Sequence, residues 1–266
     1  MGDNVPYRLT DLRFSYGNGC VLDGFTATLH EGGMVAILGP NGQGKTTLLR
    51  VMLGRLRARS GSVELYGRRL EAVPAHERAR LVAYLPQEVH AAYPLTVAEV
   101  VLMGRYPHMP AFSLESRHDW EVAERCMDRT GVRHLAKRGF MTLSGGEKRR
   151  VLVASVLAQE PKVMLLDEPT ASLDLHHQYA VMELLAGLRD EGITVLLVTH
   201  DVSLAARYCA RVWLFTEGRV LADGPPTEVI TEDSLHRLFG AGLRVLRDAE
   251  SGLPIVLPPA PEVAER

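Results

Sequence analysis

Three uninterrupted apolar runs constrain the fold of this chain more than any other feature. The runs are MVAIL (34–38), VMLL (163–166) and ITVLLV (193–198). A strand with one face in water alternates apolar and polar residues, so continuous runs indicate parallel strands that are buried on both faces. Each run ends in residues suited to chemistry, and ligands of open parallel sheets bind beyond the carboxyl ends of the strands. The sequence therefore predicts an α/β fold with a site at one edge of its sheet.

The segments around this core predict two additions. YRLTDLRFSYG, VLDGFTATLH and GSVELYGRRL alternate more and are broken by glycine turns, as expected of an antiparallel edge sheet. From Thr96, which forms a capping-box pattern with Glu99, to about residue 160 the pattern is mostly helical and is interrupted by GRYPHMPAF. We therefore expect a helical insertion there. After residue 240 the chain turns polar and proline-rich, and its last residues are expected to be loose.

Composition narrows the classes of function. The 266 residues are 46% hydrophobic, which is ample for a core, and a net charge of -2 gives no bulk basicity for binding nucleic acid. Cys20, Cys126 and Cys209 lie far apart, which favours reduced, packed thiols in a cytoplasm. The N-terminus lacks a signal-peptide core, and no apolar run approaches the roughly 18 residues that cross a bilayer. We expect a chain that does not span a membrane alone.

The segment after the first apolar run has a phosphate-binding pattern. GPNGQGKTT matches G-x-x-x-x-G-K-[ST] between a predicted strand and the helical TTLLRVML. Its glycines let backbone amides wrap phosphate oxygens, Lys45 supplies a positive charge to terminal phosphates, and the Thr46 hydroxyl can ligate magnesium. The predicted cofactor-binding residues of this loop are Gly39, Asn41, Gly42, Gly44, Lys45, Thr46 and Thr47.

Polar residues at the other strand ends complete the predicted site. Asp167 can hold magnesium and Glu168 can polarise an attacking water, although the pair alone would equally suit a solvated surface turn. His200 follows the third run and is predicted to contact a γ-phosphate, while the THD stretch could also start a helix. Gln87 follows another short apolar strand, where its amide could reach the metal or the water.

The segment LSGGEKRR predicts a helix start that is open to an anion. Ser144 and Glu147 have capping-box spacing, so each side chain can satisfy an amide of the first turn. Gly145 and Gly146 leave bare amides at the positive end of the helix, which an anion can approach closely. The basic run 148–150 is expected to be a solvated helix face.

The order of phosphate loop, glutamine, LSGGE, LLDEPT, SLD and THD resembles the ATP-binding cassette (ABC) ATPases over residues 7 to about 225. The resemblance implies a P-loop NTPase (RecA-like) core with a mostly parallel sheet, an antiparallel β subdomain and a helical subdomain at about 88–160. It places the ATPase domain at 1–240 and an extension with a flexible tail at 241–266. It also implies that Tyr16, which could otherwise simply pack in the edge sheet, stacks on adenine.

The resemblance implies ATP and Mg²⁺ as cofactors and gives single residues roles. They are Glu168 as catalytic base, His200 as switch histidine, Gln87 as the Q-loop residue that reports the metal, and Asp174 in the D-loop between subunits. Ser144, Gly145 and Gly146 would face the ATP of a second subunit, so hydrolysis would depend on closure of the dimer. Two positions depart from the family pattern, since Glu147 replaces the glutamine of LSGGQ and Gln43 replaces a small residue.

VLMGRYPH (101–108) and the ending FGAGLRV…SGLPIVLP look like the ATPases of importers for iron siderophores, haem and cobalamin. We expect a peripheral subunit at the cytoplasmic face of the inner membrane, as a homodimer beneath transmembrane permease subunits that a solute-binding protein supplies. An exporter or lipid-transport ATPase would share every catalytic motif, and only residues 88–140 and the tail oppose it. An ABC ATPase of DNA repair or translation calls for a coiled coil, zinc cysteines or a second cassette, and the sequence shows none.

Overall fold

A six-stranded sheet forms the centre of the computed structural model, which describes residues 5–17, 19–88, 94–110, 113–240 and 242–259. Its order is β10 (Arg219–Gly224), β9 (Arg211–Thr216), β3 (Met34–Leu38), β8 (Thr194–Thr199), β7 (Val163–Asp167) and β6 (Val82–Leu85). All neighbours are parallel except β10, which is antiparallel to β9. The three apolar runs are β3, β7 and β8, and every residue of these strands is buried, as predicted.

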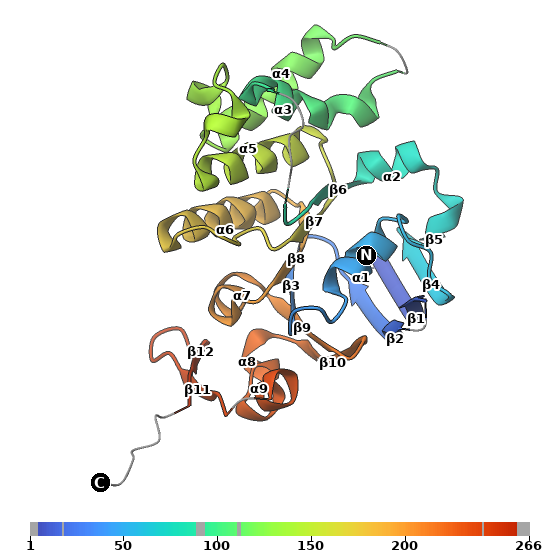
Figure 1. Ribbon diagram of the computed structural model, residues 1–266, viewed down its shortest axis with the longest axis vertical. Helices are drawn as coiled ribbons and strands as arrows, with labels where there is room; N and C mark the ends of the chain where they lie inside the picture. Colours follow the sequence, from blue (N-terminus) through green and yellow to red (C-terminus); the bar gives the residue numbers. More distant parts are fainter. Residues whose placement is uncertain (1–4, 18, 89–93, 111–112, 241, 260–266) are drawn as a thin grey trace.

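This sheet separates two hydrophobic cores, which explains its continuous apolar sequence. On β3, Met34, Ala36 and Leu38 belong to one core, while Val35 and Ile37 belong to the other. Figure 1 shows α5 (Gly145–Ala158), α6 (Leu175–Asp190) and α7 (Val202–Tyr208) on one side of the sheet. The helix α1 (Lys45–Met52) lies on the other side, with the antiparallel sheet (Figure 1). Alternate residues of each central strand therefore pack into different cores, so both faces of these strands carry mostly apolar side chains.

The predicted antiparallel edge sheet is confirmed. Its order is β2 (Gly19–Leu29), β1 (Tyr7–Tyr16), β4 (Ser60–Leu65) and β5 (Arg68–Arg69). The buried Tyr7 hydroxyl donates to the Met52 carbonyl at 3.0 Å, which ties this sheet to the end of α1. The 3₁₀-helix η1 (Leu70–Ala72) and the helix α2 (Ala75–Leu81) lead from it to β6.

The helical insertion is also present. Its elements are α3 (Val97–Leu102), η2 (Met103–His108), α4 (Arg117–Arg129), η3 (Arg133–Leu135), η4 (Phe140–Thr142) and the helix α5. The capping boxes predicted at Thr96 and Ser144 are both formed, and Ser116 forms a third at the start of α4. The predicted interruption GRYPHMPAF (104–112) begins as the 3₁₀-helix η2, and its residues 111–112 lie outside the described residues.

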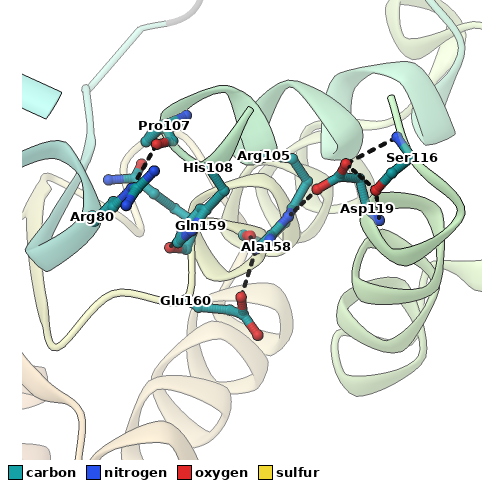
Figure 2. Close-up of polar contacts among 9 residues, drawn as sticks. All are labelled: Arg80, Arg105, Pro107, His108, Ser116, Asp119, Ala158, Gln159 and Glu160. Atoms are coloured by element: carbon teal, nitrogen blue, oxygen red, sulfur yellow. Dashed lines mark hydrogen bonds and ion pairs between the residues drawn. The ribbon is translucent and has the colours of Figure 1, made fainter. Parts of the chain in front are cut away.

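A buried arginine joins the helices of this insertion (Figure 2). Arg105 is 2% exposed, its Nε donates to Asp119 Oδ1 at 3.1 Å, and its Nη1 donates to the Ala158 carbonyl and to Glu160 Oε2, both at 2.7 Å. Asp119 also accepts from the Ser116 backbone amide and hydroxyl, and these bonds with Arg105 hold its pKa at about 2 although burial opposes them. The side chain of Arg105 thus connects η2, the start of α4 and the end of α5.

A second set of contacts ties the insertion to the central sheet. The His108 Nε2 lies 2.8 Å from the Gln159 carbonyl, and the Gln159 amide donates to the Val82 carbonyl at 2.8 Å (Figure 2 shows the first pair). Arg80 on α2 donates to the Pro107 carbonyl at 2.8 Å. The RYPH stretch is therefore a joint between the helical insertion and β6.

The chain ends in two short helices and a hairpin. These are α8 (Pro226–Val229), α9 (Glu232–Phe239), β11 (Arg244–Arg247) and β12 (Pro254–Leu257). The predicted loose end at 260–266 lies outside the described residues. Cys126 and Cys209 are buried as expected, whereas Cys20 is exposed, because it lies at the start of the edge strand β2. Within the described ranges, we find no helix whose length and apolar character would carry it across a membrane.

Candidate nucleotide site

A cavity of about 480 Å³ lies where the parallel strands end. Its lining comprises Tyr16, Val21, Asn41, Gly42, Gly44, Lys45, Thr46, Thr47, Gln87, Asp167, Glu168 and Val198. Gly39, the remaining predicted residue of the phosphate loop, follows β3 directly, and its carbonyl accepts a hydrogen bond from Lys45. The strands β3, β6, β7 and β8 all bring their carboxyl ends to this edge, so residues far apart in sequence meet here.

The phosphate loop wraps around its own lysine. Lys45 is 6% exposed, and its Nζ donates to the carbonyls of Gly39 at 2.7 Å and Pro40 at 2.6 Å. Burial lowers the pKa of Lys45, while the carboxylates of Glu168 and Asp167 oppose that shift. Two positions require glycine, since a Cβ on Gly39 would lie 2.0 Å from the Phe215 carbonyl oxygen and Gly44 has φ +104°. Lys45, Thr46 and Thr47 at the start of α1 line the cavity, so a helix N-terminus borders it, as phosphate binding requires.

Two oxygens for a metal ion lie side by side. The Thr46 Oγ1 donates to Asp167 Oδ2 at 2.7 Å, and the Tyr84 hydroxyl donates to the same oxygen at 3.4 Å. Asp167 is 2% exposed, and burial raises its pKa, which the hydrogen bonds and Lys45 oppose. A hydroxyl and a carboxylate are the oxygen donors that Mg²⁺ prefers, so this pair fits the predicted metal site.

Two of the predicted catalytic residues, Gln87 and His200, approach one carboxylate oxygen of the third, Glu168. The Gln87 Nε2 donates to Glu168 Oε2 at 3.1 Å, and the His200 Nδ1 lies 3.5 Å from that oxygen. Glu168 is 13% exposed on its side chain whereas His200 is 60% exposed, so the histidine reaches in from the surface. Asp201 caps the start of α7, which confirms the helix start in the THD stretch, while the contact of His200 with a γ-phosphate stays a prediction.

The glycines of LSGGE lie apart from this cavity. Among the described residues, its lining includes no residue of 144–146, and Ser144 and Gly145 are exposed at the start of α5. The Ser144 amide donates to Glu147 Oε2 at 2.8 Å, and the Glu147 amide donates to Ser144 Oγ at 3.3 Å. The bond to the Ser144 amide lowers the pKa of Glu147. The carboxylate that departs from the family pattern is therefore engaged by the cap of its own helix.

His177 matches no motif of the sequence analysis, yet this residue links two predicted segments. Its Nδ1 lies 2.7 Å from Asp174 Oδ1, and its backbone amide donates to the same oxygen at 2.9 Å. A Cβ on Gly146 would lie 2.0 Å from the ring of His177. Asp174 thus caps α6 and holds the ring against which the LSGGE glycine packs. Gln43, the other departure, points away and accepts from the Glu217 amide at 3.1 Å.

The expectation of a solvated face at 148–150 is wrong for Arg149, which is 6% exposed. Its guanidinium donates to the carbonyls of Pro86, Gln87, Asp167, Glu168 and Pro169. Burial lowers the pKa of Arg149 to about 10. Helical spacing could have signalled this burial, since Arg149 shares a face with the apolar Val153 and Val156.

Comparisons with known proteins agree with this site. The ABC transporter family matches residues 22–171. The ferric enterobactin transport ATP-binding protein FepC of Escherichia coli (strain K12) is 39% identical over 248 residues, which cover 93% of this chain and 92% of that protein. The hemin import ATP-binding protein HmuV of Gloeobacter violaceus is 44% identical over 234 residues, 85% of this chain and 84% of that protein.

A solved structure has the same architecture over nearly its whole length. It is a chain described as a metal-chelate type ABC transporter in an inward-facing conformation, with a TM-score of 0.85 and 31% identity. The match covers 96% of this chain and 97% of that one. Family, relatives and fold agree, and we conclude that this chain belongs to the ABC transporter family as one of its ATP-binding ATPases.

Proposed function

We propose that this chain binds and hydrolyses ATP to drive the import of a metal chelate, namely an iron siderophore, haem or cobalamin, through a separate permease. The observation that carries the proposal is the single cavity in which Lys45, the Thr46–Asp167 pair and Glu168 meet. The metal-chelate class is supported by relatives named for ferric enterobactin and hemin and by the metal-chelate type transporter of the same fold.

The residues of the cavity suit Mg-ATP. In the proposed bound state, Lys45 exchanges its two loop carbonyls for phosphate oxygens, and the half-exposed ring of Tyr16 stacks on adenine at the mouth of the cavity. Thr46 and Asp167 would hold Mg²⁺, which supplies charge neutralisation on the phosphates. Glu168 would accept a proton from the attacking water, with Gln87 and His200 orienting the carboxylate and the terminal phosphate.

A second copy of the chain would complete the site. Ser144 and Gly145 are exposed at a helix start outside the cavity, where the Gly145 amide and the Ser144 hydroxyl can meet the ATP of a partner, while the buried Gly146 packs against His177. Met141 is 55% exposed beside this segment, and Leu175 is 65% exposed beside Asp174. Large apolar side chains at such positions favour a covered surface. We therefore assign 144–146 and Asp174 to an interface that forms when the dimer closes.

The proposed assembly lies at the cytoplasmic face of the membrane, with the permease above it and the solute-binding protein touching only the permease. A second cavity of about 260 Å³ offers a docking place for a permease segment, and its lining includes Arg55, Arg78 and Tyr84. The Tyr84 hydroxyl also donates to Asp167 at 3.4 Å. A permease segment in this cavity would therefore touch Tyr84, which contacts the proposed metal ligand Asp167 directly.

Glu168→Gln tests the proposal. The amide cannot accept a proton, so we expect the variant to bind Mg-ATP, to hydrolyse it at least about 100-fold more slowly, and to accumulate as a closed dimer. Size-exclusion chromatography with and without Mg-ATP, together with phosphate release, measures both effects. Lys45→Ala, which lacks the cation for the phosphates, is the control and should stay monomeric. Wild-type hydrolysis by Glu168→Gln, or a monomer at high concentration with Mg-ATP, would refute the assigned roles.

A further inference from the structure

Arg149 has an unusual set of partners for a buried arginine. A guanidinium carries five N–H donors, and here five backbone carbonyls receive them. The Nε donates to Pro169 at 2.6 Å, and the Nη1 donates to Pro86 at 3.1 Å and to Gln87 at 3.4 Å. The Nη2 donates to Asp167 at 3.2 Å and to Glu168 at 2.5 Å. One side chain thus fixes the backbone after β6 and the backbone after β7.

Three of these carbonyls belong to Gln87, Asp167 and Glu168, which line the cavity. Gln87 and Glu168 lie on separate segments, and their side chains contact each other at 3.1 Å. The guanidinium of Arg149 connects the same two segments by hydrogen bonds to their backbone carbonyls. The relative position of the glutamine and the carboxylate therefore depends on Arg149.

Glu168 needs such support because its backbone is strained. Its φ is +47°, a left-handed conformation that is unfavourable for a residue with a side chain. The amide of Glu168 donates to the Val198 carbonyl at 3.0 Å, and its carbonyl accepts from Arg149. A hydrogen bond on each side of the strained residue holds the carboxylate toward the cavity.

We propose that Arg149 is a positioning residue that sets Glu168 and Gln87 for hydrolysis and connects them to the helix that begins with the LSGGE glycines. Arg149 lies on α5, five residues after Ser144, so a shift of this helix when the dimer closes moves the guanidinium and the carbonyls it holds. This inference rests on the proposed role of Glu168. In this proposal the first residues of α5 respond to closure of the dimer, and Arg149 on the same helix positions Glu168 and Gln87.

Arg149→Gln and Arg149→Lys test the proposal, with Lys148→Gln as a partly exposed control on the same helix. A displaced catalytic group can reduce turnover by about 100-fold, so we expect kcat to fall by about 10- to 100-fold in Arg149→Gln. The affinity for ATP should change by less than about threefold, because the phosphate loop is untouched. Arg149→Lys keeps the charge but has three donors, and should give an intermediate rate. It also serves if the glutamine variant fails to fold.

A double-mutant cycle separates positioning from a general loss of structure. Single-turnover hydrolysis is measured for Arg149→Lys, Glu168→Gln and the combination. If Arg149 acts through Glu168, adding its substitution to Glu168→Gln lowers the residual rate by less than about twofold. Multiplied effects in the combination, or wild-type kcat in both Arg149 variants, would overturn the proposal. Wild-type turnover in Glu168→Gln alone would instead refute the proposed function, so the two failures are distinguishable.

Discussion

At the scale of the residue, the candidate site combines side chains at strand ends with one arginine that acts through backbone carbonyls. Lys45, Asp167, Glu168 and His200 follow apolar runs, so the parallel sheet brings them to one edge. Arg149 differs, because its partners are carbonyls on two segments distant in the chain. A carbonyl belongs to every residue type and leaves no mark in a sequence. Partners of this kind become visible only when the fold is known.

The contact between Gly146 and His177 predicts that Gly146→Ala changes the melting temperature in opposite directions with and without the histidine ring. In the wild-type background, Gly146→Ala places a Cβ 2.0 Å from the His177 ring, which Asp174 holds in place. Overpacking costs about 1–3 kcal/mol, more than the roughly 1 kcal/mol that alanine adds to a helix, so we expect a lower melting temperature. In a His177→Ala background the ring is gone, and Gly146→Ala should raise the melting temperature.

Thermal unfolding of the four proteins measures this reversal. His177→Ala alone is the reference for the double variant, since it already lacks the bond to Asp174. A decrease of similar size in both backgrounds would show that the alanine conflicts with something other than the histidine.

At the scale of the element, local patterns identified helix starts better than helix interiors. The capping boxes at Thr96 and Ser144 join residues three apart, so a short stretch of sequence is enough to predict them. The 3₁₀-helix η2 was expected as an interruption because Pro107 and Gly104 discourage an α-helix. Its shape depends on tertiary contacts, since a Cβ on Gly104 would lie 2.0 Å from the Ser155 carbonyl oxygen on α5. Sequence alone does not show that close approach.

The capping box of α4 predicts a stability that depends on acid. Hydrogen bonds from Ser116, with the charge of Arg105, hold the pKa of Asp119 at about 2, below the roughly 3.9 of an unfolded chain. The ionised carboxylate therefore stabilises the fold fully above about pH 4, and this contribution disappears as the pH falls toward 2. Asp119→Asn should lower the free energy of unfolding on the order of 2 kcal/mol at pH 7.

Urea unfolding of both proteins between pH 7 and pH 3 measures the effect. The difference in the free energy of unfolding should narrow below pH 4, and Glu121→Gln, on the exposed face of the same helix, should show no comparable narrowing. A constant difference across this range would mean that Asp119 stabilises the protein independently of its charge.

At the scale of the whole molecule, the sequence predicted the central sheet, the edge sheet and the insertion. The extension after residue 240 was expected only to be polar, with a loose end, and no hairpin was predicted in it. Residues 244–257 form the hairpin of β11 and β12 against α7. Two partly buried valines, Val245 and Val256, make the apolar contact with the core. Two valines are too few to produce a recognisable strand pattern in a segment rich in prolines and charged residues.

The predicted boundary at residue 240 can be tested by ending the chain there. The Val245 amide donates to Glu232 Oε1 at 3.0 Å, and Arg247 donates to the Thr227 carbonyl at 2.7 Å, so these bonds tie the hairpin to α9 and α8. Because the nucleotide cavity has no lining residue from the described part of the extension, the shortened chain should keep its affinity for ATP.

Losing two partly buried valines should lower the free energy of unfolding by about 1–3 kcal/mol. Val256→Ala in the full chain weakens the same packing and should cause a smaller loss. Cooperative unfolding of the shortened chain with unchanged ATP binding would support 1–240 as an independent ATPase domain, whereas aggregation or lost binding would make the hairpin part of it.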